Sequence, residues 1–396
     1  MPSLLRKEAF YMPEGVIYLD GNSLGPLPKN ALGNLGAVVE DEWGKLLIKG
    51  WNSAGWMEQP SRVGDSLGRL IGAPQGSVVI GDTLSIKVYQ AVAAALKLNP
   101  DRRVILSETG NFPTDLYMVE GLINTLDQGY TLRTVDGASV MDAIDDSVAV
   151  VLLTEVDYRT GRKHDMNAVT ARAHENGAVM VWDLAHSAGA FPVDLAASGA
   201  EMAVGCTYKY LNAGPGAPAF IYVRPDLADQ IAPALAGWLG HRAPFDFLDR
   251  YEPGSGIERM RVGTPPVLQM SVLETALELW SDVEMQELRE ASIALQEQFI
   301  AGVEARVPEL RLASPRDPSA RGSQVSFHFE HGYAAMQALI YHDVIGDFRA
   351  PDIMRFGFAP LYLDSDDVDI AIERLTRVMT ERLWDDPKFR VRNRVT

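Results

Sequence analysis

Lys209 lies in surroundings that suit a chemically reactive amine. It stands in V-G-C-T-Y-K-Y-L-N-A-G-P-G (204–216), after a short apolar run and before a turn rich in glycine and proline. Its nearest charged neighbours along the chain are Glu201 and Arg224. Partial desolvation in such a segment favours the neutral, nucleophilic amine that a Schiff-base lysine requires. From this stretch alone, a lysine on a surface loop is the alternative.

Five short apolar runs, the last of them just before Lys209, are each followed by polar residues. The runs cover 78–80, 104–106, 148–153, 178–182 and 202–205, and none alternates polar and apolar residues. This pattern predicts strands of a parallel sheet, because such sheets are covered by helices on both faces. Ligands bind outside the carboxyl ends of these strands. We therefore expect one crevice formed by the clusters at 81–85, 107–115, 154–157, 183–187 and 206–209.

Pyridoxal 5'-phosphate (PLP) is a cofactor whose requirements this set of residues could meet. PLP needs a lysine for attachment, a carboxylate at its pyridine nitrogen, donors for its phosphate and an aromatic face for its ring. Lys209 and Asp183 suit the first two requirements. Ser85 lies where a predicted helix begins, and a helix N-terminus binds anions. Asp183 as a turn residue, Ser85 as an ordinary N-cap and Phe112 as a core residue are the alternatives.

Composition narrows the class of protein. The chain has 396 residues, 47% of them hydrophobic and 22% charged, which predicts an enzyme-sized globular protein of two domains. Its net charge of −17 argues against nucleic-acid or anionic-membrane partners. One cysteine, no apparent signal peptide and no membrane-length apolar run predict a cytoplasmic location. Dinucleotide, P-loop, nucleophile-elbow and zinc motifs are missing, so we expect no metal site.

Three regions are predicted from the order of elements: an N-terminal arm and helix packing with the small domain (1–59), a large α/β domain that binds PLP (60–265), and a linker helix with a small C-terminal domain (266–396). In the first, a helix over 31–48 with one apolar face precedes a loop at 50–56 that carries two tryptophans. A strand at 220–223 and an irregular stretch at 234–266 close the second. The third contains helices at 269–280, 284–303, 334–342 and 366–384, and strands at 323–329 and 352–359.

Six segments together resemble kynureninase, over nearly the whole chain. They are L-D-G-N-S-L-G (19–25), G-W-N-S-A-G-W (50–56), N-F-P-T-D-L-Y (111–117), D-L-A-H-S-A-G (183–189), C-T-Y-K-Y-L-N-A-G-P-G (206–216) and R-V-G-T-P (261–265). The resemblance implies an α/β fold of the fold-type-I PLP-dependent transferase architecture, with a mainly parallel sheet in the large domain and a smaller α+β C-terminal domain. It also implies a homodimer with active sites at the interface.

The resemblance implies a role for each matching residue. Lys209 attaches PLP, Tyr208 bonds the phosphate and relays protons, and Asp183 pairs with the pyridine nitrogen. Arg355 binds the substrate α-carboxylate, with a salt bridge inside the small domain as its alternative. The other cofactor-binding residues are Leu84 and Ser85 at the phosphate, Phe112 on the ring, Asp115, Thr154 and His186 near it, and Trp238 and Thr264 reaching the phosphate across the dimer interface. Ser23 and Trp51 are placed with the substrate.

The implied reaction is the hydrolytic Cβ–Cγ cleavage of L-kynurenine to anthranilate and L-alanine in tryptophan catabolism, with 3-hydroxykynurenine as a second substrate. Trp51 and Thr264 match the bacterial form that favours L-kynurenine. The departure of Lys87 and its neighbours from the expected residues leaves the details of phosphate binding open. One rival is a cysteine desulfurase-like or aminotransferase-like enzyme, although Cys206 lies too close to Lys209 in the chain to be a mobile nucleophile. The other rival, a PLP-binding sensory module, lacks the usual fused DNA-binding domain.

Overall fold

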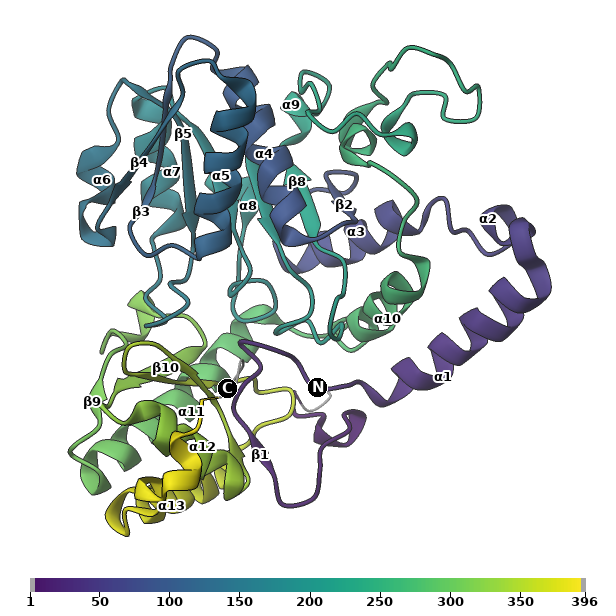
Figure 1. Cartoon of the computed structure of the whole chain (residues 1–396). Helices are drawn as coiled ribbons and strands as arrows, with labels where there is room; N and C mark the ends of the chain where they lie inside the picture. Colours follow the sequence, from purple (N-terminus) through teal and green to yellow (C-terminus); the bar gives the residue numbers. More distant parts are fainter. Residues whose placement is uncertain (1–3, 393–396) are drawn as a thin grey trace.

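A seven-stranded sheet with helices on both faces dominates the computed structural model, which describes residues 4–392 (Figure 1). Its strand order is β2-β8-β7-β6-β5-β3-β4. The strands are β2 (Val78–Ile80), β3 (Val104–Glu108), β4 (Thr131–Val135), β5 (Val148–Thr154), β6 (Val179–Asp183), β7 (Met202–Gly205) and β8 (Phe220–Val223). All neighbouring pairs from β4 to β7 are parallel, whereas β8 runs antiparallel to β7 and β2. The five predicted strands are confirmed, and β4 was missed.

The sheet is apolar on both faces, as the continuous apolar runs predict. Every residue of β5 is buried. Val150 and Leu152 pack on the face that also buries α4 (Leu84–Leu98) and α5 (Pro113–Leu126). Val151 and Leu153 pack on the other face, with α3 (Gln59–Leu70) and α7 (Met166–Glu175). Because successive side chains of a strand point to opposite faces, a strand covered on both sides needs this unbroken apolar run.

The N-terminal arm differs from the prediction of one continuous helix over 31–48 with one apolar face. Helix α1 (Lys29–Ala37) passes into a π-helical stretch, η2 (Val38–Leu46), and a 3-10 turn, η3 (Leu47–Lys49). Leu32, Trp43 and Leu47 of the predicted apolar face are 57–64% exposed. Figure 1 shows this segment projecting to the right of the body, beside α10 (Val267–Glu278). The predicted 50–56 loop begins with a short helix, α2 (Gly50–Ser53).

A four-stranded antiparallel sheet of order β12-β13-β10-β9 forms the centre of the C-terminal part. Its strands are β9 (Arg311–Leu312), β10 (Gln324–His328), β12 (Asp347–Arg349) and β13 (Ile353–Gly357), and its helices are α11 (Met285–Arg306), α12 (Gly332–Tyr341) and α13 (Ser365–Thr380). A further strand, β11 (Val344–Ile345), pairs with β1 (Ile17–Tyr18) of the arm. The predicted helices and the two longer strands are confirmed. The domain boundaries at 59/60 and 265/266 stay predictions, and the first falls within the start of α3.

Short helical segments complete the described chain. They are η1 (Lys7–Ala9), η4 (Gly137–Ser139), α6 (Val140–Ala143), α8 (Leu195–Ser198), α9 (Pro225–Ala228), η5 (Trp238–Gly240), η6 (Gly256–Met260), η7 (Pro318–Ala320), η8 (Leu383–Asp385) and η9 (Pro387–Arg390). The stretch at 234–266 contains only η5 and η6, so its predicted irregular character is confirmed. None of the helices between residues 4 and 392 is both long and apolar enough to cross a membrane.

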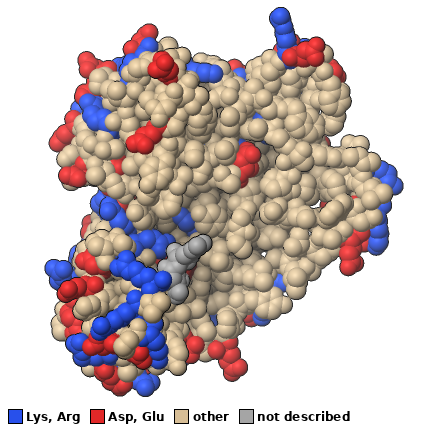
Figure 2. Space-filling model, viewed as in Figure 1, with Lys and Arg blue, Asp and Glu red and all other residues tan. Residues whose placement is uncertain are grey.

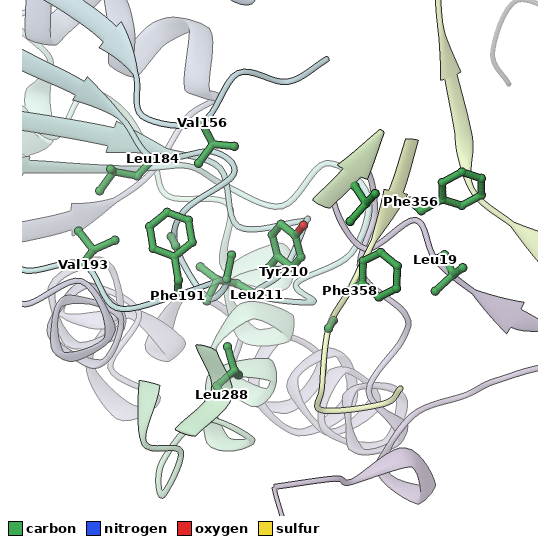
Figure 3. Close-up of a cluster of buried hydrophobic side chains, with 14 of the residues drawn as sticks. Leu19, Val156, Leu184, Phe191, Val193, Tyr210, Leu211, Leu288, Phe356 and Phe358 are labelled. Carbon is green, nitrogen blue, oxygen red and sulfur yellow. The ribbon is translucent and has the colours of Figure 1, made fainter. Parts of the chain in front are cut away.

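An apolar cluster joins the large sheet to the C-terminal part. In Figure 3, Leu184 and Phe191 of the large domain lie on one side of Tyr210. Phe356 and Phe358 of the C-terminal part lie on its other side. The Tyr210 hydroxyl donates a hydrogen bond to the Ser323 carbonyl at 3.0 Å. Burial of such large side chains stabilises the contact between the two parts. The chain segment that carries Lys209 is therefore fixed at the junction of the two sheets.

Charged side chains are distributed unevenly over the surface. On the face in Figure 2, Lys and Arg gather over the C-terminal part, although the whole chain has a net charge of −17. Arginines of the C-terminal part pair with acids, for example Arg390 with Asp385 and Arg316 with Glu304.

Candidate active site

Lys209 lies in the turn after β7, among one imidazole and two aromatic rings. Its Nζ is 3.2 Å from Nε2 of His186. The same nitrogen lies 6.0 Å from the ring centre of Phe112 and 5.8 Å from that of Tyr208. These contacts agree with the expected apolar surroundings of Lys209, which is only partly exposed.

The N-terminal turn at 20–25 packs directly on the backbone of Lys209. The amide of Gly25 donates to the Tyr208 carbonyl at 2.8 Å. A Cβ added to Gly25 would lie 2.3 Å from the carbonyl oxygen of Lys209. Asn212, with a φ of 62°, closes the turn by donating its amide to that same carbonyl at 3.0 Å. The arm therefore sets the position of a lysine that is distant in the sequence.

Thr154, the last residue of β5, lies close to polar side chains at the end of β6 and around the start of α5. Its Oγ1 donates to Oδ1 of Asn111 at 2.5 Å. The same oxygen lies 3.4 Å from Oδ2 of Asp115 and 3.4 Å from Oδ2 of Asp183. The backbone amide of Ala185 donates to Asp183 Oδ1 at 2.8 Å. Both carboxyl groups thus lie within 3.4 Å of one hydroxyl oxygen.

Asp115 and Asp183 affect each other's protonation. Burial and the neighbouring Asp183 carboxylate raise the pKa of Asp115 well above its ordinary value. Burial also raises the pKa of Asp183, but the charge of Lys209 opposes this shift. Two carboxyl groups this close do not both ionise readily. We expect Asp115 to carry the shared proton and Asp183 to carry the negative charge.

His186 and Cys206 are both electrically neutral in this environment. Burial, followed by the charge of Lys209, lowers the pKa of His186 well below its ordinary value, so its imidazole can accept a hydrogen bond from Lys209. Burial raises the pKa of the Cys206 thiol, whose Sγ lies 3.8 Å from the Ala185 carbonyl. A buried thiol of this kind is a poor nucleophile, which argues against the desulfurase alternative.

Arg355 forms a buried ion pair inside the small domain, which is the alternative to its role in substrate binding. Its Nε donates to Oδ1 of Asp347 at 2.6 Å, and its Nη2 donates to Oδ2 of the same residue. Its Nη1 donates to the Tyr158 carbonyl, and Ser23 Oγ lies 3.0 Å from its Nη2. The sequence does not identify Asp347 as a site residue, because it lies in β12, which contains no apolar run. Only the pairing of β12 with β13 brings it opposite Arg355.

The remaining predicted residues lie apart from this cluster. Trp51 packs edge-on against Trp56 and Trp238, with ring centres 6.2 and 6.4 Å apart, and Thr264 is exposed. Leu84 and Ser85 form the first turn of α4. Within residues 4–392, no hydrogen bond or ring contact joins any of the five predicted residues of this group to Lys209 or its partners; they are Trp51, Leu84, Ser85, Trp238 and Thr264. Of the five strand-end clusters, four contribute to the site and the first makes no such contact.

The residues fit the PLP cofactor. Thr83 at the N-cap of α4 makes no side-chain capping bond, which leaves the first backbone N–H groups of the helix available to an anion. Oδ1 of Asp115 and Nδ1 of His186 are buried without a hydrogen-bond partner among the described residues. Phe112 is 40% exposed, so one face of its ring is accessible. A lysine, a carboxylate, a helix N-terminus and an aromatic face are what PLP requires.

Comparisons with solved structures identify the fold. A cysteine desulfurase from Thermococcus onnurineus NA1 superimposes with a TM-score of 0.80 at 17% identity, covering 95% of this chain and 97% of its own. A C-DES mutant with glycine covalently linked to its PLP cofactor gives a TM-score of 0.78 at 19% identity, covering 95% and 99%. At these identities the likeness shows the fold alone. The predicted fold-type-I PLP-dependent architecture is confirmed.

Comparisons of sequence identify the family. A family model described as the kynureninase C-terminal domain matches residues 288–375. A kynureninase from Pseudomonas fluorescens is 50% identical across 98% of this chain and 95% of its own length. A kynureninase from Burkholderia pseudomallei strain 1106a is 49% identical with the same coverage. Because this identity extends over nearly the full length of both sequences, the chain belongs to the kynureninase family.

Proposed function

We propose that the crevice around Lys209 carries out the reaction of the family, the PLP-dependent hydrolytic Cβ–Cγ cleavage of L-kynurenine to anthranilate and L-alanine. We assign the reaction to this crevice because Lys209, His186 and the Asp115–Asp183 pair lie together at one edge of the sheet. When bound, PLP withdraws electrons from the substrate carbons next to the amine. The protein then has to hold the cofactor, orient the substrate and move protons.

Lys209 attaches the cofactor and afterwards moves the α-proton of the substrate. The contact of its Nζ with His186 at 3.2 Å supports this role, since a neutral imidazole can hold the amine in place without competing for the proton at neutral pH. Tyr208 is a second proton donor. The nearby Cys206 and burial raise the pKa of Tyr208, so the phenol keeps its proton and can donate it.

Asp183 holds the pyridine nitrogen, and Asp115 with Thr154 supports Asp183 from behind. A negative Asp183 keeps that nitrogen protonated, and a neutral Asp115 avoids a second charge in the same buried space. Leu84, through its backbone, and Ser85 hold the phosphate at the N-terminus of α4. Phe112 covers the ring. Arg355 and Ser23 bind the substrate α-carboxylate, and Trp51 lies along the aromatic ring of the substrate.

The proposed assembly is a homodimer in which Trp238 and Thr264 reach the phosphate of the other subunit. Exposed apolar side chains on two projecting segments support it. On the arm, Leu32, Trp43, Leu47 and Ile48 are 57–77% exposed. In the 234–266 stretch, Phe245, Phe247 and Leu248 are 51–79% exposed. Apolar groups in such numbers on adjacent surface segments mark an interaction surface. A cytoplasmic location completes the proposal, and the single buried cysteine is compatible with it.

The product formed from each of three amino acids tests this function. The PLP-loaded protein should release anthranilate from L-kynurenine faster than 3-hydroxyanthranilate from 3-hydroxykynurenine, because Trp51 and Thr264 match the form that favours the first. It should release no sulfide from L-cysteine above the rate of free PLP. Sulfide release without anthranilate would instead assign the desulfurase reaction.

A further inference from the structure

A cavity of about 510 Å³ lies between the large domain and η7 of the C-terminal part. Its volume falls in the range of small-molecule sites. It is lined by Glu155, Lys163 and residues 192–194 of the large domain and by residues 319–320 of the C-terminal part. The amide of Lys163 donates to the Ala320 carbonyl at 2.8 Å, which joins the two parts at the cavity wall. Within the described chain, none of the lining residues belongs to the cluster around the candidate catalytic lysine.

The carboxyl group of Glu155 is buried in this wall without a full set of partners. Glu155 is 4% exposed, and its Oε2 has no hydrogen-bond partner among the described residues. The Oγ of Ser187, which lies near it, is likewise buried without a partner. A buried polar group without a partner costs free energy, so a ligand that donates a hydrogen bond to Glu155 would be stabilised there.

The ammonium group of Lys163 is also available to a ligand. Among the described residues it forms no ion pair or hydrogen bond, and its Nζ lies 5.0 Å from the ring centre of Phe191. Burial raises the pKa of Glu155 and, among the opposing effects, the charge of Lys163 lowers it, so the two groups lie near each other. They do not pair directly, which leaves space between them. His164, another lining residue, is occupied by Glu108, whose Oε2 lies 2.7 Å from its Nε2.

Two further carboxylates, those of Asp165 and Asp194, line the cavity at exposed positions. Each caps a helix, because Asp165 accepts the Ala168 amide of α7 at 3.0 Å and Asp194 accepts the Ala197 amide of α8 at 2.9 Å. The acids of the lining would repel a simple anion, and the amine of Lys163 would repel a simple cation. A molecule that carries both charges meets a partner for each.

We propose that this cavity binds an α-amino acid with a large apolar side chain, with its ammonium group at Glu155 and its carboxylate at Lys163. Met166 and Val193, which also line the cavity, add apolar surface for the side chain of the ligand. The site is separate from the Lys209 crevice and does not depend on the reaction proposed for that crevice.

The backbone connects this cavity to the candidate active site. Glu155 directly follows Thr154, and its amide donates to the Asp183 carbonyl at 3.0 Å. Ser187, beside the Glu155 carboxyl, directly follows His186. An amino acid bound at Glu155 would therefore lie next to the strand ends that hold the candidate cofactor residues.

Binding can be measured on a form of the full chain whose cofactor cannot react with amino acids. Borohydride reduces the bond between Lys209 and PLP to a stable amine, so an added amino acid cannot replace the lysine. Calorimetric titration of this protein with L-phenylalanine should show saturable binding. Two analogues, 2-phenylethylamine without the carboxylate and 3-phenylpropanoate without the amine, should each bind at least about tenfold more weakly, the range carried by a charge-assisted hydrogen bond.

Lys163→Met and Glu155→Gln should each weaken the binding of L-phenylalanine by about tenfold or more. In Lys163→Met the preference over 2-phenylethylamine should also disappear, because the carboxylate has lost its partner. Lys97→Met, on the exposed side of α4, and Glu309→Gln, at an exposed position, are matched controls that should bind like the wild type.

Lys163 is only partly buried, so its variant decides the test even if Glu155→Gln does not fold. Two results would overturn the site. One is the absence of saturable binding to the wild type up to about 10 mM L-phenylalanine, and the other is an affinity of Lys163→Met within about twofold of the wild type.

Discussion

Gly25 lies against the carbonyl of Lys209 so closely that no side chain fits between them. A Cβ at Gly25 would stand 2.3 Å from that oxygen and 2.5 Å from Nδ2 of Asn212. The N-terminal arm therefore forms one wall of the lysine turn. Its contact with the backbone, and with the Asp347–Arg355 pair through Ser23, links the arm to both halves of the site.

Gly25→Ala should therefore displace the lysine turn and weaken the site. Overpacking a tight backbone contact costs about 1–3 kcal/mol, so we expect lower stability in denaturant unfolding and weaker PLP binding. Gly33→Ala is the control, because Gly33 lies in α1 with nothing within 4 Å of its added Cβ. That change should be neutral or stabilise the protein by up to about 1 kcal/mol. Equal stability of the two variants would contradict the close contact.

Asp183 and Asp115 should respond differently to the same substitution. An amide at Asp183 removes the negative charge at the pyridine nitrogen, so Asp183→Asn should lower kcat by about 100-fold or more. An amide at Asp115 resembles the protonated carboxyl that burial favours there, so Asp115→Asn should lose less than about tenfold. Steady-state release of anthranilate measures both. A larger loss in Asp115→Asn would show that the proton has been assigned to the wrong carboxyl.

Glu155 should make the stability of the fold depend on pH. Burial, against the opposing effects of Ser187 and Lys163, raises the pKa of Glu155 from 4.5 to about 7. Between these pH values the folded state binds more protons than the unfolded state, so stability falls as pH rises through this window. The loss is on the order of 3 kcal/mol.

Glu155→Gln should abolish this part of the pH dependence. The difference in unfolding free energy between variant and wild type, measured from pH 4.5 to 8, should shift in favour of the variant as pH rises. Glu309→Gln, at an exposed position, should show a constant difference. A constant difference in Glu155→Gln as well would mean that the carboxyl is not buried as described.

The exposed apolar side chains of the arm should hold two copies together. The monomer has a mass of 43.4 kDa, so the proposed dimer should have about twice that mass in light scattering after size exclusion. Trp43→Glu places a charge among these side chains and should shift the mass toward the monomer. Tyr117 of α5 is comparably exposed, and Tyr117→Glu should leave the mass unchanged. A monomeric wild type would rule out the sharing of Trp238 and Thr264 between subunits.

The sheet and the lysine could be predicted because each leaves a local signal. An unbroken apolar run such as Val148–Thr154 is required wherever helices cover both faces of a strand. The edge strand β4 has no such run, since Thr131 and Thr134 are exposed and only Leu132 and Val135 of its residues are apolar. The same apolar runs also predict that Asp183 and Thr154, each at the end of a strand, lie at one edge of the sheet.

Two features could not be predicted, because they depend on distant pairing. Asp347 and Arg355 meet only through the register of β12 and β13, and β12 is too short and polar to be recognised. The apolar face of the arm has helical spacing, but Leu32 and Trp43 are 64% and 57% exposed. A hydrophobic pattern indicates that a face will be covered, and it does not reveal by which surface.

Anthranilate release from L-kynurenine by the wild type and by Lys209→Ala, measured side by side by fluorescence, tests the central claim most directly. Lys97→Ala, on the exposed side of α4, serves as the matched lysine control. The wild type and Lys97→Ala should produce anthranilate at equal rates with PLP present. Lys209→Ala should produce none above the rate of free PLP and should lose the absorbance of lysine-bound cofactor. Anthranilate formation by Lys209→Ala at the wild-type rate would contradict the assignment of this crevice as the active site.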